Sequence, residues 1–213
     1  MSKPTFQIAV IPGDGIGVDV IAATRAILDA AQKRIGGFTL RYEELIAGAG
    51  YFRETGRDIA PGAEDAAGKA DAILLGAIGL PAVRHEDGTE IAPHLRLRDR
   101  YQLYAGVRPV KAYPNAPQRL ADPRAADIDL VVLRESTEGL FYSAATLNRS
   151  VVVGDDEVRD ILSITRPTTE KLHDFAFALA RKRQARGGKG LVTCVDKANV
   201  FRSMAFFRKI FDE

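Results

Sequence analysis

The chain has 213 residues, 46% of them apolar, and no low-complexity tract, so it can bury the core of one large or two small globular domains. Lys and Arg (30) nearly balance Asp and Glu (28), which gives no basis for a nucleic-acid-binding surface. The chain has a single cysteine and lacks a secretory signal pattern. Its apolar runs are well short of the roughly 20 residues that span a bilayer. These features predict a cytoplasmic protein without a membrane partner.

Strand-like and helix-like patterns alternate along the first hundred residues. The predicted strands span residues 6–12, 38–47 and 70–79, and the predicted helices span residues 18–34, 60–69 and 95–104. Glycine turns follow the first and third strands, and a polar, irregular loop over 80–94 precedes the last helix. This alternation predicts a doubly wound α/β sheet.

The second half of the chain contains three further predicted strands, two predicted helices and a predicted hairpin. The predicted strands span residues 106–113, 127–136 and 190–195, and the predicted helices span residues 168–186 and 200–213. Two short β-rich runs around Gly154 and Asp155 predict a projecting hairpin arm within residues 143–166. The strand over 127–136 places Arg134 at its carboxyl end, where α/β enzymes carry functional groups.

The two glycine turns have two interpretations. GDGIG, residues 13–17, has glycines at alternate positions and lacks the G-x-G-x-x-G spacing of a dinucleotide-binding turn. Its glycines fit equally well a sharp strand-to-helix turn with no ligand. The second turn, with Gly76 and Gly79, carries the same ambiguity.

Three arginines are candidates for binding an anion. Arg98, Arg108 and Arg134 lie at or near the ends of predicted elements, and the guanidinium fork binds carboxylates through two hydrogen bonds. Three such forks suit a di- or tricarboxylate. From the residues alone, an alternative without a ligand is favoured, in which Arg96, Arg98 and Arg100 form one solvated basic helix face.

A lysine at a predicted strand end is a candidate for proton transfer. Lys197 lies in the segment DKAN, residues 196–199. A lysine amine acts as a general base only where burial or a neighbouring cation lowers its pKa, and a plain surface lysine is the alternative. The histidines of the chain lack metal-ligand spacing, and Cys194 is interpreted as a core residue.

Six segments occur in an order that is typical of one family. They are IAVIPGDGIGVDV, ADAILLGAIGLP, LRLRDRYQLYAGVRP, LVVLRESTEGLFYS, SITRPTTEKLHDFAFALARKR and VTCVDKANVFR. They resemble the isocitrate/isopropylmalate dehydrogenase family of β-decarboxylating dehydrogenases, along essentially the whole chain. The resemblance implies that residues 1–105 form the N-terminal part of a large α/β domain. Residues 106–213 would form a small dimerisation domain with a clasp arm at about 143–166.

The resemblance also implies an activity, which is metal-dependent, NAD(P)-linked oxidative decarboxylation of a (2R)-malate with a substituent at carbon 3. Arg98, Arg108 and Arg134 match the arginines that hold the carboxylates of this small dicarboxylate substrate. Lys197 matches a lysine that takes part in proton transfer across the interface of a homodimer. The residues implied at the cofactor are Asn199, Gly76, Ile78 and Gly79.

One position departs from the family pattern. The family has a tyrosine seven positions after the arginine matched by Arg134, but this chain has Phe141 there and its phenol one position later, at Tyr142. We expect Tyr142 to serve as the catalytic proton donor if a local bulge turns it into the site. The alternative is that protonation relies on water or another group.

The sequence stops at Glu213, before the region that carries the family's metal-binding aspartates and adenine-binding segment. We therefore expect no metal ligand within this chain, no C-terminal part of the large domain, and no turnover by residues 1–213 alone. The expected cofactors are NAD, with NADP also possible, and Mg²⁺ or Mn²⁺ bound by residues beyond 213.

Substrate preference depends on the residues just before Arg98. Ala92 and His94 stand where isocitrate enzymes usually have a serine and an asparagine, and Leu95 offers an apolar surface. These residues favour 3-isopropylmalate, D-malate or tartrate over isocitrate. An alternative from another class is a non-catalytic paralogue or regulatory subunit that keeps carboxylate binding and dimerisation.

Overall fold

The computed structural model describes residues 3–144 and 151–213, and the chain divides into two compact units, Met1–Leu97 and Arg98–Glu213. The division falls inside helix α4 (Pro93–Arg100), eight residues before the boundary expected from the sequence. Within the described ranges, no helix combines the length and the apolar composition needed to cross a membrane.

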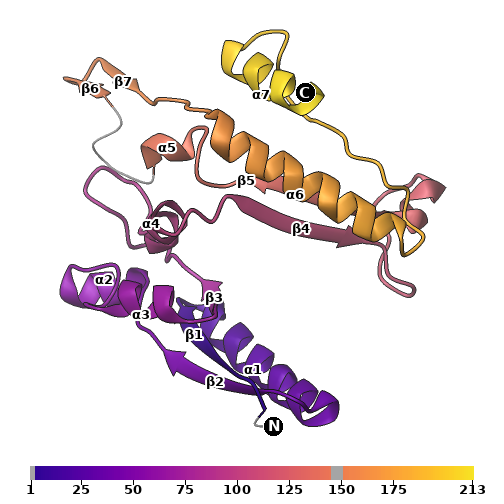
Figure 1. Cartoon of the computed structure of the whole chain (residues 1–213). Coiled ribbons are helices and arrows are strands. Elements are labelled where there is room, and N and C mark those ends of the chain that lie inside the picture. The colour runs from indigo at the N-terminus through magenta and orange to yellow at the C-terminus, as the bar shows by residue number, and fades with distance from the viewer. Residues whose placement is uncertain (1–2, 145–150) are drawn as a thin grey trace. The chain divides into compact units, whose positions relative to one another are not determined.

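The first unit contains a three-stranded parallel sheet in the order β2-β1-β3 (Figure 1). Its strands are β1 (Thr5–Gly13), β2 (Thr39–Glu44) and β3 (Ala72–Ala77), and its other helices are α1 (Ile16–Ile35), α2 (Ala49–Thr55) and α3 (Ala63–Lys69). Parallel crossovers are right-handed, so the change of direction at central β1 places α1 on one face of the sheet and the β2–β3 connection on the other. The predicted α/β class is confirmed, whereas α2 was not predicted.

Close backbone packing explains the glycines at the ends of β1 and β3. Ala9, Val10 and Ile11 of β1 are fully buried. A Cβ atom at Gly76 would lie 2.0 Å from the carbonyl oxygen of Pro12, and one at Gly13 would lie 2.0 Å from the carbonyl oxygen of Ala77. Side chains at these positions would therefore force β1 and β3 apart, which supports the ligand-free interpretation of Gly13 and Gly76.

Asp14, the second residue of GDGIG, joins three turns of the first unit. Its buried carboxylate accepts hydrogen bonds from the backbone N–H groups of Ala49, Gly50 and Gly79, each at 2.8 Å. Ala49 and Gly50 begin helix α2, and Gly79 follows strand β3. The carboxylate thus caps α2 and ties it to the carboxyl ends of β1 and β3.

The second unit is built on an antiparallel pair of strands with helix α6 lying along it (Figure 1). Its elements are β4 (Ala105–Lys111), η1 (Pro123–Asp127), β5 (Asp129–Glu135), α5 (Phe141–Ala144), β6 (Val151–Val153), β7 (Glu157–Arg159), α6 (Arg166–Gln184) and α7 (Arg202–Asp212). Strands β6 and β7 form the hairpin predicted within residues 143–166, of which 145–150 lie outside the described residues.

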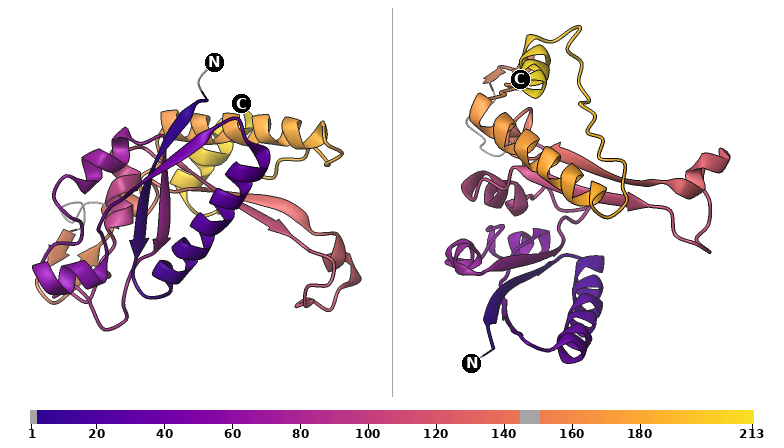
Figure 2. Two further views of the ribbon diagram at one scale, coloured as in Figure 1. Left: turned by 90° about the horizontal axis from the view of Figure 1, so that it is seen from below. Right: turned by 45° about the vertical axis from the view of Figure 1, so that its right-hand side comes forward.

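The strand predicted over residues 190–195 is wrong. The segment between α6 and α7 is extended, but it belongs to no sheet, and Figure 2 shows no strand beside it within this unit. Its exposure alternates as in a strand: Leu191 and Val195 are exposed, whereas Val192 and Cys194 are half-buried. The sequence has the period of a strand, but a strand also needs a hydrogen-bonding neighbour, and the described residues provide none.

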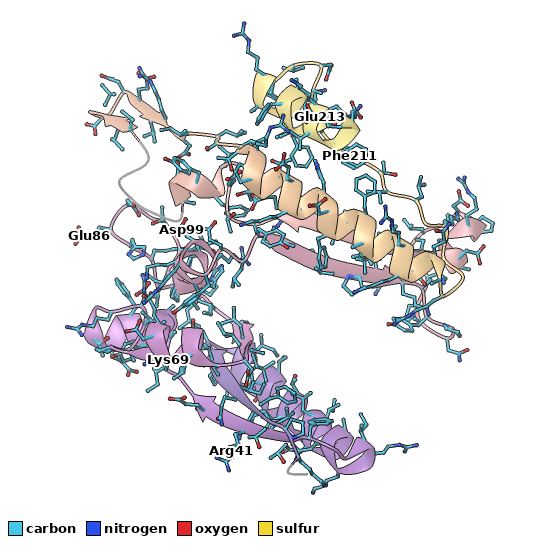
Figure 3. All side chains as sticks on the ribbon, in the orientation of Figure 1. Arg41, Lys69, Glu86, Asp99, Phe211 and Glu213 are labelled. Atoms are coloured by element: carbon cyan, nitrogen blue, oxygen red, sulfur yellow. The ribbon has the colours of Figure 1, made fainter. Side chains whose placement is uncertain are left out.

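Helix α7 packs on α6 through an aromatic cluster (Figure 3). The ring of His173 on α6 lies 4.7 Å from that of Phe207 and 5.3 Å from that of Phe211, both edge-to-face, and Phe177 stacks on Phe211 at 5.4 Å. His173 is buried, and neither ring nitrogen has a hydrogen-bond partner in the described part of the chain. Burial lowers the pKa of His173, and the nearby Asp174 only partly opposes this effect.

The Asp14 substitution tests the tie between the three turns. Asp14→Ala should lower the free energy of unfolding by about 3 kcal/mol, because three N–H groups lose their acceptor. Urea titrations followed by circular dichroism measure the change. Asp19→Ala, an exposed aspartate in the first turn of α1, should cost less than about 1 kcal/mol. Equal effects of the two substitutions would contradict the role of Asp14.

The aromatic cluster should make stability depend on pH. The pKa of His173 is lowered in the folded chain, so the unfolded chain binds the proton more readily. Its contribution to the free energy of unfolding is complete above a pH of about 6.5, the ordinary histidine value, and is lost as the pH falls below it. Urea titrations at pH 7 and pH 5 should show that the free energy of unfolding falls less between these two pH values in His173→Leu than in the wild type. His85→Leu should keep the wild-type dependence.

Candidate functional site

Strand register places two arginines on one face of the β4–β5 pair. Gly106 is opposite Arg134, and Arg108 is opposite Val132. Positions two apart on a strand face the same side, so Arg108 and Arg134 are diagonal neighbours on one face. Gly106 has no side chain to occupy the space opposite Arg134. Two like charges at this spacing repel each other, which is typical of a site that binds an anion.

Arg98 is the third member of this group. It lies near the C-terminus of α4, the end of a helix that favours a cation. Burial lowers the pKa of the Arg98 guanidinium, and the charges of Arg134 and Arg108 lower it further. The three guanidinium groups are therefore close enough to interact, and the structure brings together the three arginines proposed from the sequence.

The acidic side chains next to Arg134 are engaged elsewhere. Glu135 accepts hydrogen bonds from the backbone N–H and hydroxyl of Thr137, at 2.7 and 2.6 Å, and from the N–H of Glu138 at 2.6 Å. Glu138 in turn accepts hydrogen bonds from the backbone N–H and hydroxyl of Thr165, at 2.8 and 2.5 Å. Across residues 3–144 and 151–213, none of the three guanidinium groups forms an ion pair.

An aromatic ring holds Arg134 in place. The Cζ atom of Arg134 lies 5.2 Å from the centre of the Phe141 ring, within the range of a cation–π interaction. The Nε atom of Arg134 is buried and has no hydrogen-bond partner among the described residues. Phe141 and Tyr142 are consecutive in α5, where successive side chains point about 100° apart. The residue in contact with Arg134 is therefore Phe141.

The single solvated face proposed for the arginines of α4 is wrong. Arg96 donates hydrogen bonds of 2.9 and 3.1 Å to the two carboxylate oxygens of Asp58, and its Nε donates to Glu64. Arg100 instead lies over the ring of Tyr101, with its Cζ 5.5 Å from the ring centre. Arg96 thus has a structural role in the first unit, whereas Arg98 is under the influence of the charges of Arg134 and Arg108.

Internal contacts of the first unit engage the residues proposed at the cofactor. The N–H of Gly79 donates to Asp14, so it is not available to a phosphate oxygen. Gly76 packs against Pro12, and Ile78 would be 3.1 Å from a Cβ atom at Gly13. These residues do not form a phosphate cradle, and their role at a cofactor stays a prediction.

Lys197 and Asn199 lie in a turn between α6 and α7, and both side chains are exposed. The carbonyl oxygen of Lys197 accepts hydrogen bonds from the N–H groups of Val200 and Phe201, at 3.0 and 3.1 Å. No described contact joins Lys197 to the three arginines. Among the residues that the structure places, no group of three His, Cys, Asp or Glu side chains could hold a metal ion.

Sequence reasoning missed the structural roles of Asp14 and Asp196. Asp14 follows a glycine in a sharp turn, which gives a weak local signal of a capping carboxylate. Asp196 pairs with Arg208, but no local pattern relates residues twelve positions apart. The capping role of Asp14 could therefore in principle be predicted from the sequence, whereas the pairing of Asp196 with Arg208 could not.

Comparisons with known proteins agree with this architecture. The family model described as "Isocitrate/isopropylmalate dehydrogenase" matches residues 7–213. A 3-isopropylmalate dehydrogenase of Heyndrickxia coagulans is 35% identical over 98% of this chain and 56% of its own length. A 3-isopropylmalate/3-methylmalate dehydrogenase of Methanocaldococcus jannaschii is 34% identical over 96% of this chain and 55% of its own length.

Two solved structures share the fold. An isocitrate dehydrogenase from Methylococcus capsulatus has a TM-score of 0.76 and 26% identity, over 97% of this chain and 56% of that chain. A β-decarboxylating dehydrogenase from Thermococcus kodakarensis has a TM-score of 0.65 and 31% identity, over 97% of this chain and 53% of that chain. The chain spans about half the length of the curated relatives it matches. By its match to the family model over residues 7–213, the chain belongs to the isocitrate/isopropylmalate dehydrogenase family.

Proposed function

We propose that the complete gene product carries out NAD(P)-linked, metal-dependent oxidative decarboxylation of a (2R)-malate-type acid. In this reaction carbon 2 would give a hydride to the nicotinamide while its hydroxyl gives up a proton. The carboxylate on carbon 3, which is β to the new ketone, would then leave as carbon dioxide, and carbon 3 would take up a proton, which gives a 2-keto acid. The observation that carries the proposal is the group formed by Arg98, Arg108 and Arg134, which lacks acidic partners among the described residues.

The arginines would bind and orient the diacid. Arg108 and Arg134 stand side by side on one sheet face, so their guanidinium forks can engage neighbouring carboxylates, each through two hydrogen bonds. The ring of Phe141 supports Arg134 from one side, which restricts the directions that its free N–H groups can take. Burial, and then repulsion from Arg134 and Arg108, lower the pKa of Arg98, and a bound dianion would relieve the repulsion. Fixed donors of this kind are typical of binding and catalytic sites for carboxylates.

The proposal places Lys197 in a partner subunit's site. We propose a homodimer joined by the β6–β7 arm, so that Lys197 moves a proton across the interface. Support comes from the exposed valines of the arm, with Val152 and Val158 67% and 65% exposed. A two-stranded hairpin with exposed apolar side chains is only marginally stable in water, and it gains stability when a partner surface covers those side chains. The expected cytoplasmic location stays a prediction.

The proposed cofactor is NAD, or alternatively NADP, and the proposed metal is Mg²⁺ or Mn²⁺. A bound nicotinamide supplies the hydride acceptor, and Asn199 is the residue proposed near it. Gly76, Ile78 and Gly79 are engaged in internal contacts and do not form a phosphate cradle. The described residues also include no cluster suited to Mg²⁺ or Mn²⁺.

The substituent at carbon 3 is proposed to be small and uncharged, or absent. Leu95 lies on α4, one turn before Arg98, and is half-buried. Neither Ala92 nor His94 supplies the hydroxyl and amide groups expected for a third carboxylate. This composition favours 3-isopropylmalate, D-malate or tartrate over isocitrate.

A second candidate function is a non-catalytic subunit that binds the diacid and dimerises. The observation that favours it is the contact of Phe141 with Arg134, because a phenylalanine has no proton to donate where the family pattern has a phenol. Such a protein would bind the diacid without turning it over.

A turnover assay separates the two functions. The complete gene product should reduce NAD or NADP with 3-isopropylmalate, D-malate or tartrate in the presence of Mg²⁺, as measured by absorbance at the wavelength of the reduced nicotinamide. Arg134→Gln should lower kcat/KM by about 100-fold, because one charged, two-hydrogen-bond contact is lost. Arg119→Gln, at an exposed arginine, should leave kcat/KM unchanged. Binding by calorimetry without turnover would favour the non-catalytic subunit.

Tyr142 is the proposed proton donor, and its role can be tested alone. Tyr142→Phe should lower kcat by about 100-fold, the lower end of the range for general acid catalysis, with little change in KM. Tyr113→Phe, at an exposed phenol, is the matched control. An unchanged kcat in Tyr142→Phe would assign the proton to water or another group.

A further inference from the structure

The turn that carries Lys197 and Asn199 is fixed by a buried carboxylate between two exposed side chains. The side chain of Asp196 is only 4% exposed, whereas Lys197 is exposed. Its Oδ1 accepts a hydrogen bond of 2.8 Å from the N–H of Ala198, which closes the turn. Its Oδ2 lies 3.4 Å from Sγ of Cys194. One carboxylate therefore bonds to both sides of Lys197 along the chain.

Arg208 ties this carboxylate to helix α7. Both Nε and Nη2 of Arg208 lie 2.7 Å from Oδ2 of Asp196, which gives a charge-assisted contact with two N–H donors. The N–H of Ala198 and the Arg208 contact both lower the pKa of Asp196, so the carboxylate is ionised when it binds. Burial raises the pKa of Cys194, whose thiol can then donate to the carboxylate.

Helix α7 packs firmly against α6, so Arg208 holds Asp196 from a helix that is itself fixed in position. His173 and Phe177 of α6 pack against Phe211 of α7, and Arg166 at the start of α6 forms an ion pair of 2.6 Å with Glu213. Asp196 lies in a segment that has no strand partner among the residues that the structure describes, so few other backbone contacts hold it. The contact with Arg208 thus links that segment to the packed helix pair.

We propose that Asp196 and Arg208 are positioning residues that hold the turn of Lys197 and Asn199 in one conformation. The inference rests on the proposed function for the role of Lys197, but the conformation of the turn can be measured without it. A surface ion pair would add little to stability or order. Here the carboxylate is buried and also accepts a backbone hydrogen bond inside the turn, which couples the position of α7 to the direction of the lysine.

The test compares three variants of the complete gene product. Arg208→Met should lower kcat by at least tenfold and change KM for the diacid less than twofold, since the arginines that bind the diacid are untouched. Arg208→Lys keeps the charge but not the two-donor fork, and should restore part of kcat. Lys209→Met, at the neighbouring exposed residue of α7, should behave as the wild type. The partial rescue by lysine distinguishes positioning from a general loss of fold.

Hydrogen exchange of the backbone amides gives the second readout. Arg208→Met should speed exchange at Ala198 and Val200 by at least tenfold, with unchanged exchange in α6, and Lys209→Met should not. Unchanged exchange at these amides, or faster exchange with an unchanged kcat, would overturn the inference. If the wild type turns over no diacid, the proposed function fails, and the exchange rates alone decide whether Asp196 and Arg208 hold the turn.

Discussion

Electrostatic repulsion among three guanidinium groups is the constraint on which the second unit depends. The register of β4 and β5 places Arg108 and Arg134 on one face, and burial with mutual repulsion lowers the pKa of Arg98. The neighbouring acids do not neutralise the group, because Glu135 and Glu138 bind backbone N–H groups of the adjoining turns. Such repulsion lowers stability, and a bound anion would relieve it, as at many functional sites.

In the first unit, by contrast, the charges of Asp14 and Arg96 have partners. Asp14 is surrounded by three backbone N–H donors, and Arg96 is held by two carboxylates, so both charges are fully satisfied within the unit. The Asp14 contacts fix the turns at the carboxyl ends of β1 and β3, where ligands bind in many α/β folds. Satisfied charges here build a scaffold, and unsatisfied charges in the second unit mark the place where chemistry is proposed.

The segment between α6 and α7 connects the scaffold of the second unit to its proposed chemistry. It has the alternating side chains of a strand but no strand partner among the described residues, so Asp196 and Arg208 supply its order. The β6–β7 arm is likewise a minimal element with exposed valines. Both elements carry exposed apolar side chains, Leu191 and Val195 in the segment and Val152 and Val158 in the arm.

The sequence by itself determined the parallel strands of the first unit, the helices α1, α6 and α7, the hairpin and the family. These features follow from local periodicity, turn residues and the order of six segments. Only the tertiary structure decided that residues 190–195 form no strand, that Phe141 contacts Arg134, and that Asp14 and Asp196 bind groups far along the chain. Strand pairing, side-chain direction and ion pairs depend on which segments meet in space, and local sequence patterns do not contain that information.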